Sequence, residues 1–182
     1  MRKLLFVSCV AFMTACGDAP KEESTTVSGA ADSTATATVI EYPYKLNEPY
    51  KNWQPGDQQH AVTVMNSLQA WENGDIAKSM EPFADSVEIN FDNWAGTYSK
   101  DSLAKQFSAY RSSLASASVQ MQDWESVIAQ DKSEEWVTLW YKQITTDKKG
   151  KTDSMACVND ARIVNGKIAV LNEAVRRLPA KK

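Results

Sequence analysis

The sequence is poor in the residues from which metal sites are usually built. It contains one histidine, His60, and three cysteines among 182 residues. Structural and catalytic zinc sites need clusters of Cys, His and carboxylate side chains, which a lone histidine does not supply. His60 also falls in the first turn of a predicted helix, where we expect it to face solvent. We therefore expect neither a metal nor a cofactor.

An excess of basic residues is also absent. Lysine and arginine number 20 against 23 aspartates and glutamates, so the net charge is −3 and the pI is near 5.3. Proteins that bind nucleic acid need a basic surface to neutralise phosphates. We therefore expect no nucleic-acid partner.

Long apolar runs are missing except at the N-terminus, where residues 4–13 form a run too short to span a bilayer. It follows a basic pair, as in a secretory signal. The next segment, Met13-Thr14-Ala15-Cys16, resembles a bacterial lipobox. The resemblance implies a signal peptide over residues 1–15 and membrane attachment through a lipid on Cys16. The alternative is an ordinary signal peptide followed by a chance cysteine.

A lipid on Cys16 implies a location in a Gram-negative cell envelope. We expect the outer membrane, with the periplasmic or surface side left open. Cys9 would leave with the signal peptide, so Cys157 would be the remaining free thiol. An intramolecular disulfide in the mature domain is then not expected.

Two changes of composition precede the predicted domain. Residues 16–38 are rich in Ser, Thr, Ala and Asp with almost no large apolar side chain, which predicts a disordered tether. Residues 39–56 hold aromatic side chains among prolines and predict an extended arm. Apolar residues at helical spacing follow Asp57, a suitable N-cap, so we place the domain at residues 57–178.

Within the domain, helices are predicted first and long strands later. Apolar stripes at helical spacing predict three helices, and a short strand precedes the third of them. Four long strands rich in β-branched and aromatic residues follow and are predicted to pair antiparallel. Three helices on one face of a curved, mainly antiparallel sheet make an α+β fold. The stripes cover residues 61–71, 76–83 and 103–114, and the strands cover 87–91, 119–129, 134–146, 151–164 and 167–177.

The turns between the last strands predict which side chains share a face. Asn165-Gly166 predicts a two-residue turn, because a type I′ turn needs positive φ at both central positions. This register places Asn159 opposite Asn172. A turn centred on Lys149-Gly150 places Trp140 beside Asn159. Since side chains alternate between faces, Trp136 and Thr138 join these residues on the more apolar face, and the opposite face holds Val137, Leu139, Tyr141, Asp160, Arg162 and Glu173.

We assign the more apolar face to the core and to a candidate ligand pocket. Buried amides need hydrogen-bond partners. Asn159 and Asn172 therefore either satisfy each other or a water, or present donors and acceptors to a ligand. The candidate ligand-binding residues are Trp136, Thr138, Trp140, Asn159 and Asn172, with Trp94 and Tyr98 ahead of the third helix.

Two carboxylates are candidate catalytic bases, Asp123 and Asp92. One parity of the turn at residues 130–133 places Asp123 in the row with Trp140, where burial would raise its pKa. The other parity places Trp124 there, as part of an aromatic wall. The sequence leaves both arrangements open.

Several segments resemble the nuclear transport factor 2-like superfamily, in its SnoaL-like branch. The resemblance covers about residues 57–176 and implies a cone, in which a curved sheet wraps around a helix and leaves an apolar pocket at the wide end. The matching segments are Ala70-Trp-Glu-Asn-Gly-Asp75, Phe83-Ala-Asp-Ser-Val87, Gly96-Thr-Tyr-Ser-Lys-Asp-Ser-Leu103 and Asp160-Ala-Arg-Ile-Val-Asn-Gly-Lys-Ile168.

This superfamily includes ketosteroid isomerase and polyketide cyclases, together with domains that bind or assemble without chemistry, so the fold does not decide the function. The isomerase uses an Asp base and an oxyanion hole made of a Tyr and a protonated Asp. The resemblance would place that base at Phe91, one residue from Asp92, and that Tyr at Ser67. Neither position matches, which argues against isomerase chemistry.

We therefore expect an envelope lipoprotein whose domain binds a small apolar or amphipathic molecule without catalysis. One alternative is an acid–base enzyme of the cyclase or isomerase type. Another is an interaction module that pairs through the sheet, for example as a homodimer. Leu139 and Tyr141 on the outward face, beside Arg162, would favour that contact.

Overall fold

The computed structural model describes residues 42–92 and 94–179. The expected signal peptide, the lipidated Cys16 and the tether lie outside the described residues, as does the start of the arm. The chain divides into a unit that ends at Lys45 and a compact unit from Leu46 onward. All helices and strands of the described residues lie in the second unit.

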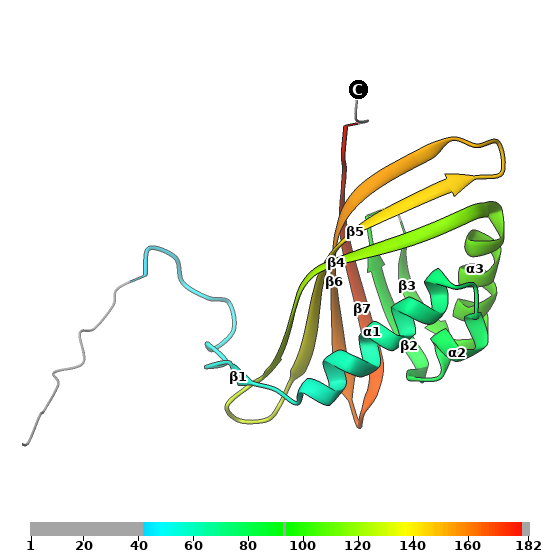
Figure 1. The fold of residues 1–182 in the computed structure, drawn as a ribbon. Helices are drawn as coiled ribbons and strands as arrows, with labels where there is room; N and C mark the ends of the chain where they lie inside the picture. The colour runs from blue at the N-terminus through cyan, green and yellow to red at the C-terminus, as the bar shows by residue number, and fades with distance from the viewer. Residues whose placement is uncertain (1–41, 93, 180–182) are drawn as a thin grey trace, which may run out of the picture. The chain divides into compact units, whose positions relative to one another are not determined.

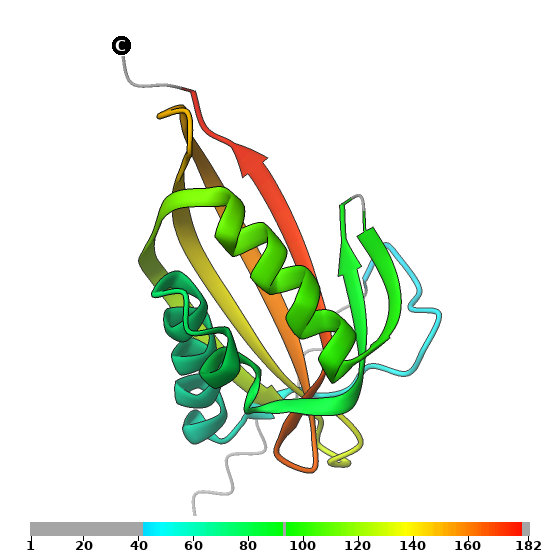
Figure 2. The same ribbon diagram turned by 90° about the vertical axis from the view of Figure 1, so that its right-hand side faces the viewer.

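Three helices lie on one side of the sheet (Figure 2), and polar side chains cap each of them at its N-terminus. Helix α1 spans Gln58–Glu72, and Asp57 accepts a hydrogen bond of 2.8 Å from the Gln59 amide. Helix α2 is short, Ile76–Met80, with Asp75 as its cap. Helix α3 spans Lys100–Ser113 and is capped by Ser99. The predicted stripes are buried in part: Ala61, Val64, Trp71, Met80 and Leu103 face the core. Tyr110 of the third stripe is 47% exposed, and Phe83 of the second lies in the strand Phe83–Phe91.

One curved sheet of seven strands carries the rest of the domain (Figure 1). Its strand order is β1-β4-β5-β6-β7-β2-β3, and all neighbours pair antiparallel except β2 and β7, which are parallel. The expected α+β fold with a mainly antiparallel sheet is confirmed. The strands are Gln54–Pro55, Phe83–Phe91, Trp94–Ser99, Leu114–Ile128, Glu135–Asp147, Thr152–Val164 and Lys167–Arg177.

The register between β5 and β6 differs from the prediction by one residue. Asp147 and Lys151 close a three-residue loop, in which Gly150 has a φ of +84° and the Asp147 carboxylate accepts two backbone N–H bonds. Leu139, rather than Trp140, therefore lies opposite Asn159. Because a slip of one residue exchanges the faces, the expected core position of Trp136, Thr138 and Trp140 is wrong.

The register between β6 and β7 also differs, although the Asn-Gly turn is placed as predicted. Val164 pairs with Lys167 and Ile163 with Ile168, but Arg162 then pairs with Val170. Ala169 is the extra residue of a β-bulge, so every later side chain of β7 changes face. Glu173 lies opposite Asn159, and Asn172 lies opposite Asp160. The predicted Asn159–Asn172 pair is therefore wrong.

The core lies between the concave face of the sheet and the helices. Tyr141, Ile89, Leu103 and Leu139 are among its largest fully buried side chains. Burying a large aliphatic side chain stabilises a fold by about 1.5–3 kcal/mol. None of the helices in the described ranges has the length and hydrophobicity needed to span a bilayer.

Candidate functional site

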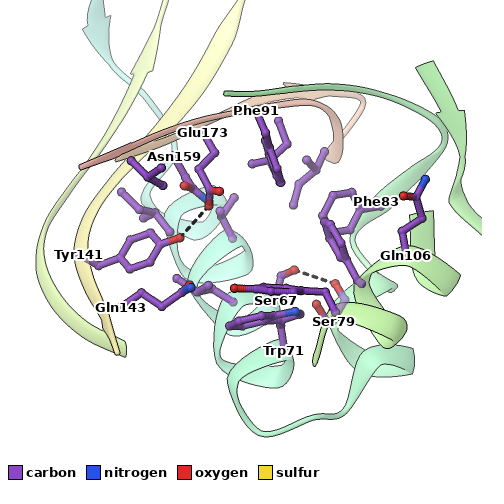
Figure 3. Close-up of a pocket in the computed structure, with 18 of the residues that line it drawn as sticks. Ser67, Trp71, Ser79, Phe83, Phe91, Gln106, Tyr141, Gln143, Asn159 and Glu173 are labelled. Carbon is purple, nitrogen blue, oxygen red and sulfur yellow. Dashed lines mark hydrogen bonds between the residues drawn. The ribbon is translucent and has the colours of Figure 1, made fainter. Parts of the chain in front are cut away.

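A cavity of about 480 Å³ lies between the concave face of the sheet and the three helices (Figure 3). Its walls are mostly aliphatic and aromatic, with a few polar groups. The lining residues are Val64, Ser67, Leu68, Trp71, Ser79, Phe83, Phe91, Trp94, Gln106, Phe107, Tyr110, Leu139, Tyr141, Gln143, Met155, Asn159, Ile168, Leu171, Glu173 and Val175.

Three polar side chains from neighbouring strands meet on the sheet wall of this cavity (Figure 3). Tyr141 of β5 donates its hydroxyl proton to Glu173 Oε2 of β7 over 3.5 Å. Asn159 of β6 lies between them, with Nδ2 3.2 Å from Glu173 Oε2 and 3.2 Å from the Tyr141 oxygen. The orientation of this amide is assigned from the hydrogen bonds that it completes. We call Tyr141, Asn159 and Glu173 the polar triad.

Burial dominates the protonation of the triad. It raises the pKa of the Glu173 carboxyl because the charged form loses its hydration, and the negative charge of Asp92 acts in the same direction. The hydrogen bond from Tyr141 opposes this shift by stabilising the carboxylate. Burial also raises the pKa of Tyr141 well above its usual range, and the Glu173 charge adds to that effect.

Aromatic rings form much of the remaining wall. Trp71 of α1 stacks on Tyr110 of α3 with ring centroids 6.0 Å apart. Trp94 of β3 contacts both Phe91 and Phe107 in edge-to-face geometry, at 5.4 and 6.1 Å. Large flat side chains of this kind offer apolar contact area at low cost in conformational entropy, which suits a binding wall.

The charges around the cavity are unbalanced. None of the described residues that line it is a lysine, arginine or histidine, and Glu173 is the one ionisable carboxyl among them.

On the helix side, the Ser67 hydroxyl donates to the Ser79 carbonyl over 2.7 Å, so this serine is already satisfied. Across residues 42–92 and 94–179, no group of three His, Cys, Asp or Glu is placed to hold a metal ion.

The candidate ligand-binding residues from the sequence divide between the two faces of the sheet. Asn159 and Trp94 line the cavity. Tyr98 lies outside the lining, and its hydroxyl oxygen accepts a 2.7 Å hydrogen bond from Trp94 Nε1. The others belong to the outer face: Thr138 bonds Asp160 over 2.6 Å, Asn172 accepts from Asn90 over 3.1 Å, and neither Trp136 nor Trp140 lines the cavity.

The candidate bases also lie outside the lining. Asp123 is exposed and pairs with Trp140, and Asp92 is exposed at the turn between β2 and β3. Trp124 pairs with Leu139 but is 48% exposed and does not reach the cavity. A β-bulge between Met121 and Asp123 shifts the register of β4. Asp123 therefore joins the row with Trp140, as one of the two predicted arrangements has it, but this row lies on the outer face, so the carboxylate is exposed and not buried in the cavity.

Sequence reasoning missed Glu173, Tyr141 and Gln143, which the cavity contains. Tyr141 was assigned to the outer face because the predicted β5–β6 register is one residue off, and Glu173 because the bulge at Ala169 was not foreseen; Gln143 was left unassigned. No signal of polarity marked the inner face of β5, because Val137, Leu139 and Tyr141 alternate with Trp136, Thr138 and Trp140. The outward apolar pair on which the expected dimer contact rested, Leu139 and Tyr141, is buried inside.

Comparisons with known proteins place this geometry in a known fold. No family model matches the sequence, and no curated protein is similar to it. Among solved structures, AusH from Aspergillus nidulans covers 68% of this chain and 87% of its own length, with 12% identity and a TM-score of 0.55. AclR from Streptomyces galilaeus covers 68% of this chain and 83% of its own length, with 13% identity and a TM-score of 0.54. An NTF2-like protein of unknown function from Burkholderia pseudomallei covers 64% of this chain and 90% of its own length, with 15% identity and a TM-score of 0.54.

The domain has the nuclear transport factor 2-like fold. At identities this low the likeness extends to the fold alone, and the chemistry has to be argued from the cavity itself.

Proposed function

We propose that the domain binds a small amphipathic molecule, whose apolar body fills the cavity and whose polar group meets the triad. One observation carries this proposal: three convergent polar side chains stand on one wall of a mostly apolar cavity. Ligand sites are typically concave, apolar and supplied with few polar groups that fix orientation. The volume of about 480 Å³ also falls within the usual range of about 300–1,000 Å³ for drug-sized ligands.

A fluorescent apolar probe tests this proposal. Phenylnaphthylamine is neutral near pH 7, so saturable binding reports the apolar cavity without requiring a charge. Met155→Trp places an indole at the cavity wall, and we expect it to weaken probe binding about tenfold. Ala156→Trp is the matched control, because the next residue of β6 faces the other side of the sheet. Equal loss in both variants, or no saturable binding by the wild type, would contradict the proposal.

Acid–base chemistry of the cyclase or isomerase type is the second candidate, consistent with the SnoaL-like resemblance. It is favoured by one observation, a buried carboxyl with a raised pKa beside a phenol. Glu173 would remove a proton from a carbon next to a carbonyl and return it elsewhere. The test is deuterium incorporation into apolar ketones in D₂O. Exchange no faster with wild type than with Glu173→Gln would exclude this reaction for those ketones.

We also propose that the domain is held in a Gram-negative envelope by a lipid on Cys16. The supporting observations are the basic start, the short apolar run and the small-small-Cys ending of residues 2–16. Metabolic labelling with an alkyne fatty acid should mark the wild type and not Cys16→Ser. Protease access in whole cells would then distinguish a surface from a periplasmic position. A labelled Cys16→Ser protein would contradict lipidation at this residue.

A further inference from the structure

We propose that the ligand of this cavity is a cationic amine, whose ammonium group pairs with Glu173 while its apolar part packs against the aromatic wall. This inference rests on the proposed function and names its ligand class. It follows from three properties of the cavity: its charge, the free oxygen of Glu173 and the arrangement of its rings.

The charge of the cavity selects against anions. Among the described residues of the lining, Glu173 is the one carboxyl, and no cationic side chain accompanies it. Asp92, at the turn that follows β2, adds a second negative charge close enough to act on Glu173. A buried carboxylate without a counter-charge is costly, and a cation in the cavity offsets that cost. A fatty acid or phosphate would instead meet repulsion.

The hydrogen bonds of Glu173 leave one oxygen available. Tyr141 and Asn159 both donate to Oε2. No side chain or amide of the described residues donates to Oε1, and the residue lines the cavity (Figure 3). An ammonium group carries only donors. It can therefore donate to the free Oε1 of Glu173, while Tyr141 and Asn159 hold Oε2 in place. The triad thus orients the carboxylate toward a bound cation.

Aromatic faces complete the environment that an ammonium group prefers. Phe91 follows Asn90 in β2, which pairs in parallel with Asn172, so Phe91 lies beside Glu173 (Figure 3). Trp71, Tyr110 and Trp94 line the same cavity. A cation within about 6 Å of a ring centroid is attracted by the negative face of the ring. A carboxylate together with several aromatic rings is thus suited to an amine with an apolar body.

Three probes of equal length test the inference. Phenylbutylamine, phenylbutanol and phenylbutanoate differ only in a positive, neutral or negative end group. By calorimetry near neutral pH we expect the amine to bind wild-type protein about tenfold more tightly than the alcohol, and the carboxylate most weakly. Glu173→Gln keeps the shape of the side chain and removes its charge, so the preference for the amine should fall to within about twofold. Glu88→Gln is the control, because Glu88 is an exposed carboxylate on β2 outside the lining.

A pH titration of the wild type gives a second measurement that needs no variant. The groups that face Glu173 are Tyr141 from β5, Cys157 from β6, Tyr110 from α3 and Asp92. The pKa of each phenol is raised, and that of Cys157 is raised to about 11, so these three groups stay neutral. Protonation of Glu173 as the pH falls should weaken amine binding and leave phenylbutanol binding unchanged. The loss should be absent in Glu173→Gln.

The outcomes separate this inference from the proposed function. Equal affinity for amine and alcohol, or amine affinity that ignores pH, would overturn the cationic ligand while leaving a small-molecule cavity in place. Failure of folded wild-type protein to bind any of the three probes would count against both. A preference for the amine that disappears with the Glu173 charge supports both.

Discussion

Asn159 lies directly opposite Glu173 in the β6–β7 ladder, and their side chains meet with Nδ2 3.2 Å from Oε2. Leu139 faces Asn159 from the other side, on β5. The pairing of these strands therefore sets an acid and an amide into an apolar wall. A buried polar group is tolerated when it is hydrogen-bonded, and the triad satisfies this condition while leaving one carboxyl oxygen toward the cavity.

The hydroxyl of Tyr141 is the third member of that arrangement, and its removal tests the triad. Tyr141→Phe should lower the free energy of unfolding by about 1–3 kcal/mol, because Asn159 and Glu173 lose a buried partner. It should also raise the pKa of Glu173 further, since the lost hydrogen bond stabilised the carboxylate. Urea unfolding and a carbon NMR titration of the Glu173 carboxyl measure the two effects. Tyr50→Phe, at a 65% exposed side chain, is the control and should change neither.

The raised pKa of Glu173 makes the stability of the domain depend on pH. The folded state holds this proton more tightly than the unfolded chain, whose carboxyl titrates near 4.5. The unfolding free energy should therefore decrease as the pH rises from about 4.5 through the folded-state pKa, and level off above it. Glu173→Gln should lack this decrease. Unfolding midpoints of the wild type and of Glu173→Gln, measured every half unit of pH, should show this decrease as a difference between the two proteins that widens with pH. A constant difference would contradict the burial of an ionisable carboxyl.

Arg111 of α3 joins two walls of the cavity by binding the end of α1. Its Nη2 donates to the Glu72 carbonyl over 2.9 Å, and its Nε lies 3.2 Å from the Trp71 carbonyl. Both carbonyls lie in the last turn of α1, where the helix itself supplies few donors, although the Gly74 amide also donates to the Trp71 carbonyl over 2.9 Å. Arg111→Met should cost about 1–3 kcal/mol in unfolding free energy. It should also weaken phenylnaphthylamine binding, because Trp71 and Tyr110 stack at this junction. Lys105→Met, at an exposed position of the same helix, should do neither.

The sequence was sufficient for most of the elements and for the fold class, because these depend on local patterns. Asp57 caps α1 as predicted, and β7 spans residues 167–177 as predicted. The segment that begins at Trp94 is not among the predicted strands. It forms β3, because the turn between β2 and β3 lies earlier and the chain pairs with β2 from Trp94 onward.

The faces of the strands could not be predicted, since each depends on a single residue in a turn or bulge. A three-residue loop closed by Asp147, where two residues were expected, moves Tyr141 into the cavity. A bulge at Ala169 moves Glu173 there as well. Because side chains alternate strictly between the two faces of a strand, the length of this loop and the position of this bulge decide which carboxyl lines the cavity. No composition or spacing in the sequence marks Ala169 as a bulged residue.

The bulge itself can be tested by changing the length of β7. Deleting Ala169 removes the extra residue and leaves Arg162 opposite Val170, so Glu173 should still face Asn159. The deletion should keep the raised pKa of Glu173 with a modest loss of stability. Inserting an alanine after Ala169 while the existing bulge is kept should instead turn the later residues to the other face. Leu171 would then leave the core, at a cost of about 2–5 kcal/mol, and the carboxyl of Glu173 would titrate as a solvated acid. The same NMR titration and urea unfolding compare the two variants, and an insertion variant that keeps the raised pKa would show either a second bulge or a two-residue slip that removes the first.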